Sequence, residues 1–256
     1  MDVWEELLSG LRPPRIVTII GGGGKTGLMY YLQTAWGLAG RTAIAATTTK
    51  LRRDPACRYA AITSLAEGVA AVEAALRQHE RITLVAGVAA EDSAKMAGVP
   101  PEWIDCLAAG FSDTVFLNEG DGSAGRPLKG HLAYEPVIPA ASGLVIAVVG
   151  VDALGAPLAI AAHRPERAAE LTGAQPDSPV NVALAARLLL HPEGYLRQCP
   201  PASRVVFFIN KVESAGQDQQ ARELATAILA GGHPRVDAVV IGSVCRREFR
   251  QVVAEP

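Results

Sequence analysis

Residues 16–26 read IVTIIGGGGKT, and this stretch decides the fold of the chain. Its first half, Ile16–Ile20, is apolar or β-branched, which is typical of a buried strand. Glycines then interrupt the strand. Residues 27–38 space their apolar side chains as a helix does, and Gly40 follows at the end. A strand, a glycine-rich turn and a helix in this order form an arrangement that binds phosphate groups.

The glycine-rich turn resembles the P-loop pattern G-x-x-x-x-G-K-[ST]. Glycines let backbone N–H groups turn towards a phosphate without Cβ clashes, and the following helix adds partial positive charge at its N-terminus. We expect Lys25 to reach the β- and γ-phosphates and Thr26 to place its hydroxyl on Mg²⁺. Ile19 stands where the pattern has glycine, so the turn is expected to be short. The expected backbone cradle consists of Gly21, Gly22, Gly23 and Gly24.

Two alternatives remain open for the same turn. Gly22, Gly24 and Gly27 also match the dinucleotide fingerprint G-x-G-x-x-G, which requires an acidic residue about 20 positions further on. The second apolar run ends instead in residues 47–50, TTTK, which argues against NAD. NADP stays open, because Lys50 or Arg52 can meet a 2′-phosphate. The other alternative is a glycine-rich turn that binds no ligand.

Apolar runs and helical segments alternate along the rest of the chain. The expected strands are 16–20, 42–46, 82–85, 114–117, 144–149, 205–209 and, as the last one, 238–241; the expected helices are 27–38, 65–77, 102–109, 181–190 and 221–229. The strands are apolar throughout, as in parallel sheets that are covered on both faces. We therefore predict an α/β fold: a single doubly wound, mostly parallel sheet flanked by helices, P-loop NTPase-like, forming one domain over residues 1–256.

The composition is that of a globular protein, since 49% of the 256 residues are hydrophobic and 20% are charged. The formal charge is −2, from 24 Lys+Arg and 26 Asp+Glu, so no broad nucleic-acid-binding face is expected. The longest apolar run, 144–151, is far shorter than the ~20 residues that span a membrane, and no membrane partner is expected. The N-terminus lacks a basic and apolar leader, and the four cysteines form no CxxC pair, which together indicate the cytoplasm.

Acidic residues follow the expected strand 114–117. Glu119 and Asp121 lie two positions apart, so along an extended backbone both can face the same side. Magnesium requires carboxylate ligands, and we assign one of the two to the metal, directly or through water. The other can position a nucleophile or act as a base. A solvated acidic turn before Gly122 is the alternative.

Polar residues at other strand ends are further candidates. Thr48, Thr49 and Lys50 suit phosphate or substrate binding, although threonines also simply extend a strand. Residues 210–213, NKVE, resemble the NKxD motif in which a GTPase aspartate accepts two hydrogen bonds from guanine. We therefore place Asn210 and Lys211 at the nucleotide. Glu213 replaces the aspartate, which leaves guanine or adenine open, as well as an exposed strand end with no base.

Two cations in loops complete the candidate site. Lys129 lies in a loop rich in glycine and proline, and it either binds an anionic substrate or is solvated. Arg164 follows the strand 144–149 and can stabilise transferring charge, as arginine fingers do.

Together these segments resemble one family, the accessory proteins of selenium-dependent molybdenum hydroxylases, called YqeC-like. The resemblance rests on GGGGKT at 21–26, TTTK at 47–50, EGDGS at 119–123, PLK at 127–129, EPVIP at 135–139, VVGVDALG at 148–155, HRPE at 163–166 and INK at 209–211. The family usually has alanine where this chain has Gly120. The resemblance implies a cytoplasmic nucleotide-binding protein that helps to mature a selenium- and molybdenum-containing cofactor. Its partners would be a nucleoside triphosphate and a molybdenum hydroxylase or its cofactor intermediate.

We therefore expect a Mg²⁺-dependent P-loop NTPase that uses ATP or GTP and assists this maturation. In this hypothesis Lys50, Lys129 and Arg164 line the transfer site. Three alternatives remain: a nucleotide-gated delivery chaperone for the hydroxylase, a small-molecule kinase, and, least favoured, an NADP oxidoreductase.

Overall fold

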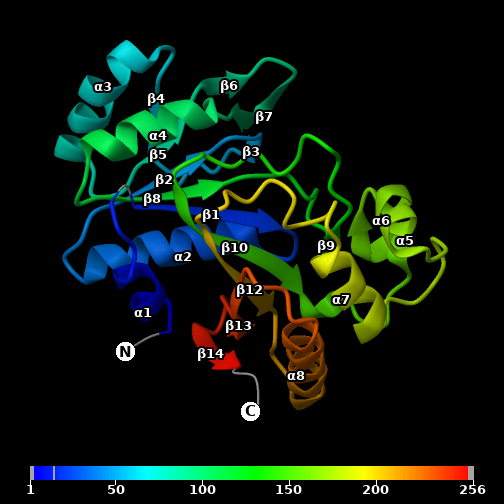
Figure 1. Ribbon diagram of the computed structural model, residues 1–256. Helices are drawn as coiled ribbons and strands as arrows, with labels where there is room; N and C mark the ends of the chain where they lie inside the picture. Colours follow the sequence, from blue (N-terminus) through cyan, green and yellow to red (C-terminus); the bar gives the residue numbers. More distant parts are fainter. Residues whose placement is uncertain (1–2, 14, 253–256) are drawn as a thin grey trace.

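The computed structural model describes residues 3–13 and 15–252 (Figure 1). Its centre is a sheet of nine strands in the order β14-β13-β12-β10-β1-β8-β2-β5-β4, parallel except for β14. In that order the strands span Glu248–Val252, Val236–Ser243, Arg204–Asn210, Ser142–Gly150, Arg15–Gly21, Val115–Glu119, Ala43–Thr47, Thr83–Val85 and Tyr59–Ala61. The prediction of an α/β fold with one mostly parallel sheet is confirmed. That residues 1–256 form one domain stays a prediction.

Helices cover both faces of the sheet. The helices α1 (Val3–Ser9) and α2 (Lys25–Leu38) pack on one face, and α3 (Leu65–Gln78), α4 (Pro101–Gly110), α7 (Val182–Leu190) and α8 (Ala215–Ala230) pack on the other (Figure 1). Alternate residues of a strand therefore enter different cores: Val206 and Phe208 face the first layer, whereas Phe207 faces the second. This explains why the strands are apolar throughout.

Shorter elements gather at the carboxyl ends of the strands. The pair β9 (Leu128–Lys129) and β11 (Ala162–His163) lies near α5 (Leu158–Ala161) and α6 (Pro165–Thr172), and a 3₁₀ turn, η1, spans Val151–Ala153. The strands β3 (Leu51–Arg52), β7 (Asp92–Ala97) and β6 (Gly87–Ala89) form a second, small antiparallel sheet that shares no strand with the main sheet (Figure 1). In these described parts of the chain, no helix combines the length and apolarity needed to cross a membrane.

The expectation that 238–241 is the last strand is wrong. Strand β14 follows β13 and pairs with it antiparallel, from Ser243↔Glu248 to Val239↔Val252. Its sequence, EFRQV, is mostly exposed because it forms the edge of the sheet. An edge strand of this kind lacks the continuous apolar run by which the buried strands were predicted.

Candidate phosphate-binding site at the glycine loop

The glycine loop connects β1 to α2 at the carboxyl edge of the sheet, and β1 lies between β8 and β10. The loop is pressed against neighbouring backbone. A Cβ at Gly22 would lie 2.4 Å from the carbonyl oxygen of Arg126, and one at Gly23 would lie 2.2 Å from the amide nitrogen of Gly150. Gly23 also has a φ of +77°. Close packing therefore requires glycine at both positions, and the backbone conformation requires it at Gly23 as well.

The first three amides of the loop are bonded within the protein. Gly21 N donates to both carboxylate oxygens of Asp121 at 3.0 Å. Gly22 N donates to Val148 O and Gly23 N to Arg126 O, each at 2.9 Å. Of the four glycines predicted to cradle phosphate, Gly21, Gly22 and Gly23 therefore hold the loop in place, and only Gly24 has a free amide in the described structure.

The backbone amides that have no hydrogen-bond partner in the described structure lie at the start of α2. The first bond of the helix runs from Leu28 N to Gly24 O at 3.1 Å. Within residues 3–13 and 15–252, no side chain caps the helix, and no acceptor bonds the amides of Gly24, Lys25, Thr26 or Gly27. Four free N–H groups at a helix N-terminus attract an anion, because they add hydrogen bonds to the partial positive charge of the helix.

The side chain of Lys25 turns back towards the end of β1 and the loop that follows β8. Its side chain is almost fully buried, and its Nζ donates to Gly21 O at 2.7 Å and to Ser123 Oγ at 3.3 Å. The ammonium also lies 3.3 Å from Asp121 Oδ1 and 3.9 Å from Glu119 Oε1. The sequence-predicted lysine and both predicted carboxylates therefore come together at one place.

Thr26 and Glu119 make direct contact. The hydroxyl of Thr26 donates to Glu119 Oε2 at 2.7 Å. Burial of Glu119 raises the pKa of its carboxyl group, and the nearby Lys25 charge and the Thr26 hydrogen bond only partly oppose this. A hydroxyl and a carboxylate side by side are the hard oxygen ligands that magnesium takes, with water and phosphate oxygens completing its shell. This pair fits a magnesium ion.

Asp121 has its oxygens occupied by protein donors. Besides Gly21 N and Lys25, its Oδ2 receives the His131 Nε2–H at 2.6 Å. Burial acts to raise the pKa of Asp121, but the charge of Lys25 and the hydrogen bond with His131 outweigh it and lower that pKa. Burial lowers the pKa of His131, so the ring is a neutral donor. Asp121 therefore holds the glycine loop and Lys25 in place, while Glu119 is the carboxylate next to Thr26.

Two comparisons with known proteins identify the family of this chain. Residues 17–166 match the family described as YqeC protein. The chain belongs to the YqeC family. It is 32% identical over 209 residues to the Uncharacterized protein YqeC of Escherichia coli (strain K12), an alignment that covers 80% of this chain and 78% of that protein. The expected resemblance to YqeC proteins is thereby confirmed.

Five of the eight motifs that carry the resemblance to YqeC proteins meet in one largely buried network. Lys129, fully buried, donates to Gly122 O at 2.6 Å and to Glu135 Oε1 at 3.0 Å, and its Nζ lies 3.5 Å from Asp121 Oδ2. Arg164 bonds the other oxygen of Glu135. The network joins the GGGGKT, EGDGS, PLK, EPVIP and HRPE segments.

Of the two alternatives that the sequence left for Lys129, a solvated lysine is wrong, because the side chain is fully buried, while binding of an anionic substrate stays a prediction. The Lys129 ammonium is enclosed by protein oxygens, so it shapes the loop 119–123 and presents no charge to solvent. The pKa of Glu135 is lowered, because the charges of Lys129 and Arg164 outweigh the effect of its burial. Glu135 and His131 were not singled out from the sequence; both lie near sequence motifs, but only the fold places them against Lys129 and Asp121.

The TTTK segment of the YqeC resemblance lies one strand beyond β8. Thr48 donates its hydroxyl to Val137 O at 2.7 Å, and Thr49 lies beside the acidic loop, since a Cβ at Gly122 would be 4.0 Å from its Oγ1. Lys50 is half exposed to solvent, and its Nζ lies 3.2 Å from Glu91 Oε1. Only the threonines lie close to the site residues described above.

The end of β12 contacts the glycine loop directly. The Asn210 Nδ2 donates to Gly23 O at 2.8 Å, and its Oδ1 accepts from Val244 N at 3.0 Å. Lys211 instead extends to Asp152, with 2.7 Å between Nζ and Oδ2. Asn210 therefore stabilises the glycine loop directly, whereas Lys211 contacts Asp152 in η1.

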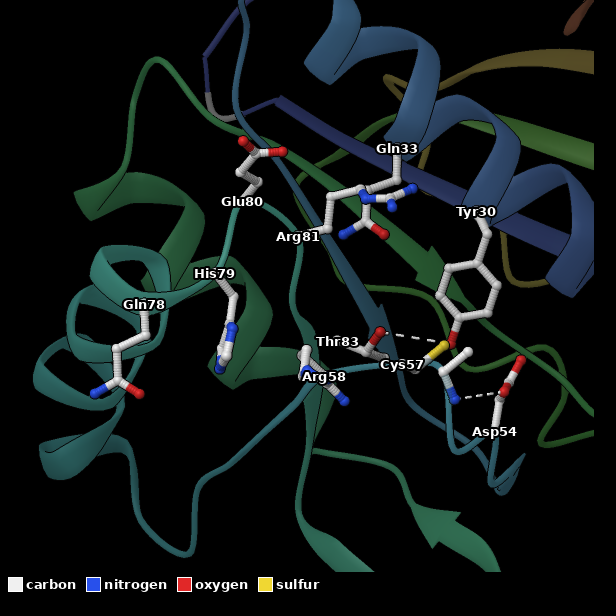
Figure 2. Close-up of a pocket in the computed structure, with 11 residues that line it drawn as sticks. Tyr30, Gln33, Asp54, Cys57, Arg58, Gln78, His79, Glu80, Arg81 and Thr83 are labelled. Carbon is white, nitrogen blue, oxygen red and sulfur yellow. Dashed lines mark hydrogen bonds between the residues drawn. The ribbon is translucent and has the colours of Figure 1, made fainter.

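A separate cavity of about 530 Å³ lies beside α2, near the start of β5 (Figure 2). Tyr30 and Thr83 point towards one another across it, 3.4 Å apart at their hydroxyls, with Cys57 beside them. None of the site residues predicted from the sequence lines this cavity. The chemistry predicted from the YqeC motifs is therefore gathered at the glycine loop and not at this cavity.

Proposed function

We propose that this YqeC-family protein binds a magnesium nucleoside triphosphate at the glycine loop and hydrolyses it, or transfers its phosphate, in the maturation of a molybdenum hydroxylase. The observation that carries the proposal is the 2.7 Å contact between Thr26 and Glu119 directly beside the free amides of α2. An anion site and a cation site are adjacent, which suits a phosphate chain with its metal ion.

In this proposal the terminal phosphates lie on the amides of Gly24, Lys25, Thr26 and Gly27. Lys25 Nζ leaves Gly21 O and Ser123 to reach the phosphate oxygens, a change of partner that its long side chain permits. Thr26 and Glu119 would hold the magnesium ion. When bound, that ion would supply positive charge against the charge that develops on the phosphate oxygens. Asp121, held by Gly21 and His131, keeps the loop in shape throughout.

The burial of the Lys25 ammonium near two carboxylates favours a second candidate, a nucleotide-gated delivery role. The ammonium is buried and shared between Asp121 and Glu119. A lysine held in this way supports slow turnover until a partner, the hydroxylase or its cofactor intermediate, shifts the loop 119–123. Phosphate release that is stimulated by the partner distinguishes this candidate from an independent NTPase.

The assignment to maturation rests on family membership, together with what the resemblance to accessory proteins of selenium-dependent molybdenum hydroxylases implies. The assignment to nucleotide rests on the residues themselves. A dinucleotide is disfavoured, because that fingerprint needs Gly27 for close packing, whereas a Cβ at Gly27 would meet its nearest neighbour, Val244 Cγ1, at an ordinary 3.6 Å.

The test is a calorimetric titration of the protein with ATP, GTP, CTP and NADPH, each with magnesium and again with chelator. We expect magnesium-dependent binding of at least one triphosphate, abolished by Lys25→Ala. The matched control is Lys95→Ala, which removes a lysine that lies exposed on β7. Circular dichroism of both variants checks that the fold survives. Binding of NADPH alone, or of no nucleotide, would overturn the proposal.

A further inference from the structure

Two loops beside the glycine loop carry polar groups that the phosphate site does not use. They follow β12 and β13, at residues 210–213 and 243–246, and Val212 N donates to Gly242 O at 3.0 Å to hold them together. Asn210 bonds both Gly23 O and Val244 N, so it fixes the two loops relative to the glycine loop. Val244 lies 3.6 Å from the place where a Cβ of Gly27 would be. The loops therefore border the N-terminus of α2.

Glu213 is the acidic side chain of these two loops, and it has a single side-chain hydrogen bond among the described residues. The Ser243 hydroxyl accepts from Arg246 N at 3.3 Å and donates to Glu213 Oε1 at 2.9 Å, which fixes the direction of the bond. Glu213 N donates to the Gln217 side chain at 2.9 Å, which holds the backbone. The side chain is exposed, and among the described residues no cation pairs with it. One carboxylate oxygen is thus positioned, while the other has no hydrogen-bond partner among residues 3–13 and 15–252.

Lys211, the lysine nearest to Glu213 in the sequence, already pairs with another carboxylate. Lys211, two residues before Glu213, adopts a φ of +66° and directs its ammonium to Asp152 in the turn after β10. Within the described residues, no cation therefore pairs with the Glu213 carboxylate, which borders the proposed site. A carboxylate is an acceptor only, so its ligand must offer N–H or O–H donors.

Among nucleobases, guanine offers the matching edge. Its N1–H and its 2-amino group are adjacent donors that one carboxylate can accept together. Adenine presents the N1 lone pair beside its amino group, which a carboxylate repels. A hydrogen bond to a charged acceptor is worth more than one between neutral groups, so the mismatch is costly.

We propose that Glu213, positioned by Ser243, selects guanine, so that the nucleotide of this protein is a guanosine triphosphate. This inference rests on the proposed function, since the phosphates must occupy the glycine loop for the base to reach the two loops. It goes beyond the sequence motif, which left guanine and adenine open because glutamate stands where NKxD has aspartate. The Ser243 bond holds the longer side chain at the rim, and the loops after β12 and β13 form the base subsite.

The test compares the affinities of the wild-type protein for magnesium GTP, ITP, XTP and ATP by calorimetry. We expect GTP to bind about tenfold to hundredfold more tightly than ATP. ITP, which lacks the 2-amino group, should fall between them. Glu213→Gln should remove the preference for GTP and improve binding of XTP, because an amide can donate to the oxygen that xanthine carries at C2. Ser243→Ala should weaken the preference for GTP over ATP several-fold.

The matched control is Glu223→Gln, the same chemical change at an exposed position of α8, and it should leave the GTP preference intact. Equal affinity for GTP and ATP, both lost in Lys25→Ala, would overturn the guanine subsite but leave the proposed function standing. A GTP preference that persists in Glu213→Gln would also overturn it. Binding of no triphosphate would overturn both proposals.

Discussion

Thr26 and Glu119 are 93 positions apart in the sequence, yet the threonine hydroxyl lies 2.7 Å from the glutamate carboxylate. The parallel pairing of β1 and β8 explains the contact. Ile19 is in register with Glu119, so the turn that leaves β1 rises directly beside the end of β8. The first residues of α2 then fold back over that end. The candidate magnesium pair is thus a consequence of strand order.

The pair gives a first prediction. Thr26→Val removes the hydroxyl but keeps the shape of the side chain, and it should weaken magnesium-dependent nucleotide binding roughly tenfold or more. Thr26→Ser keeps the hydroxyl and should bind nearly as well as the wild type. The measurement is nucleotide affinity with magnesium and with chelator. Equal losses in both variants, or a loss that persists in chelator, would contradict a metal-binding role for Thr26.

The glycine loop gives a prediction about stability. Gly23→Ala should fail to fold or lose several kcal/mol of stability, since its Cβ would lie 2.2 Å from Gly150 N at a φ of +77°. Gly27→Ala should be tolerated or even stabilise by up to about 1 kcal/mol, because Gly27 lies in the first turn of α2 with room for a methyl group. Chemical denaturation of the two variants makes the comparison. Strong destabilisation by Gly27→Ala would instead support the interpretation of this turn as a dinucleotide fingerprint.

Lys129 is predicted to contribute to stability. Lys129→Met removes the buried cation that faces Glu135 and Asp121, and we expect a loss of about 3–5 kcal/mol, because carboxylates are left buried without it. Adding Glu135→Gln should recover part of this loss. The control Lys50→Met breaks a solvent-exposed pair and should cost no more than about 1 kcal/mol. A Lys129→Met protein that is as stable as the Lys50→Met control would show that the network is weak.

The lowered pKa of Glu135 gives a pH dependence with a definite sign. A carboxyl group whose pKa falls on folding stabilises the protein above its unfolded pKa, and that contribution is lost as the pH drops through its folded pKa. Glu135→Gln should therefore be less stable than the wild type at pH 7, by about 1–3 kcal/mol. The difference should shrink at pH values below the ordinary value of 4.5. Urea denaturation from pH 7 to about pH 3 measures it, with Glu223→Gln as the exposed control.

The buried strands and their helices were predictable because their signals are local. Ile16–Ile20 and residues 205–209 form strands of the central sheet as expected, since both faces are covered and the apolar run is continuous. Strand β14 and the small sheet of β3, β6 and β7 were missed. They are short or half exposed, so their sequences resemble loops, and only pairing with neighbours makes them strands.

The candidate site was predictable in its members but not in their arrangement. Lys25, Thr26, Glu119 and Asp121 were all named from the sequence, and they do lie together. Their spacing alone did not distinguish which of the two acids would contact the metal ion. The structure places His131 and Gly21 on Asp121, which leaves Glu119 as the acid that contacts Thr26.

By itself, the sequence determined the α/β class, the family and the glycine loop with its lysine and threonine, because strand, turn and helix signals lie within a few residues of one another. Only the tertiary structure decided which groups remain free for a ligand. The amides of Gly21, Gly22 and Gly23 are taken by residues at least 100 positions away, and Lys129 is enclosed by Glu135 and Asp121. Such assignments depend on which strand ends and loops the parallel sheet brings to one edge, and that is a property of long-range packing.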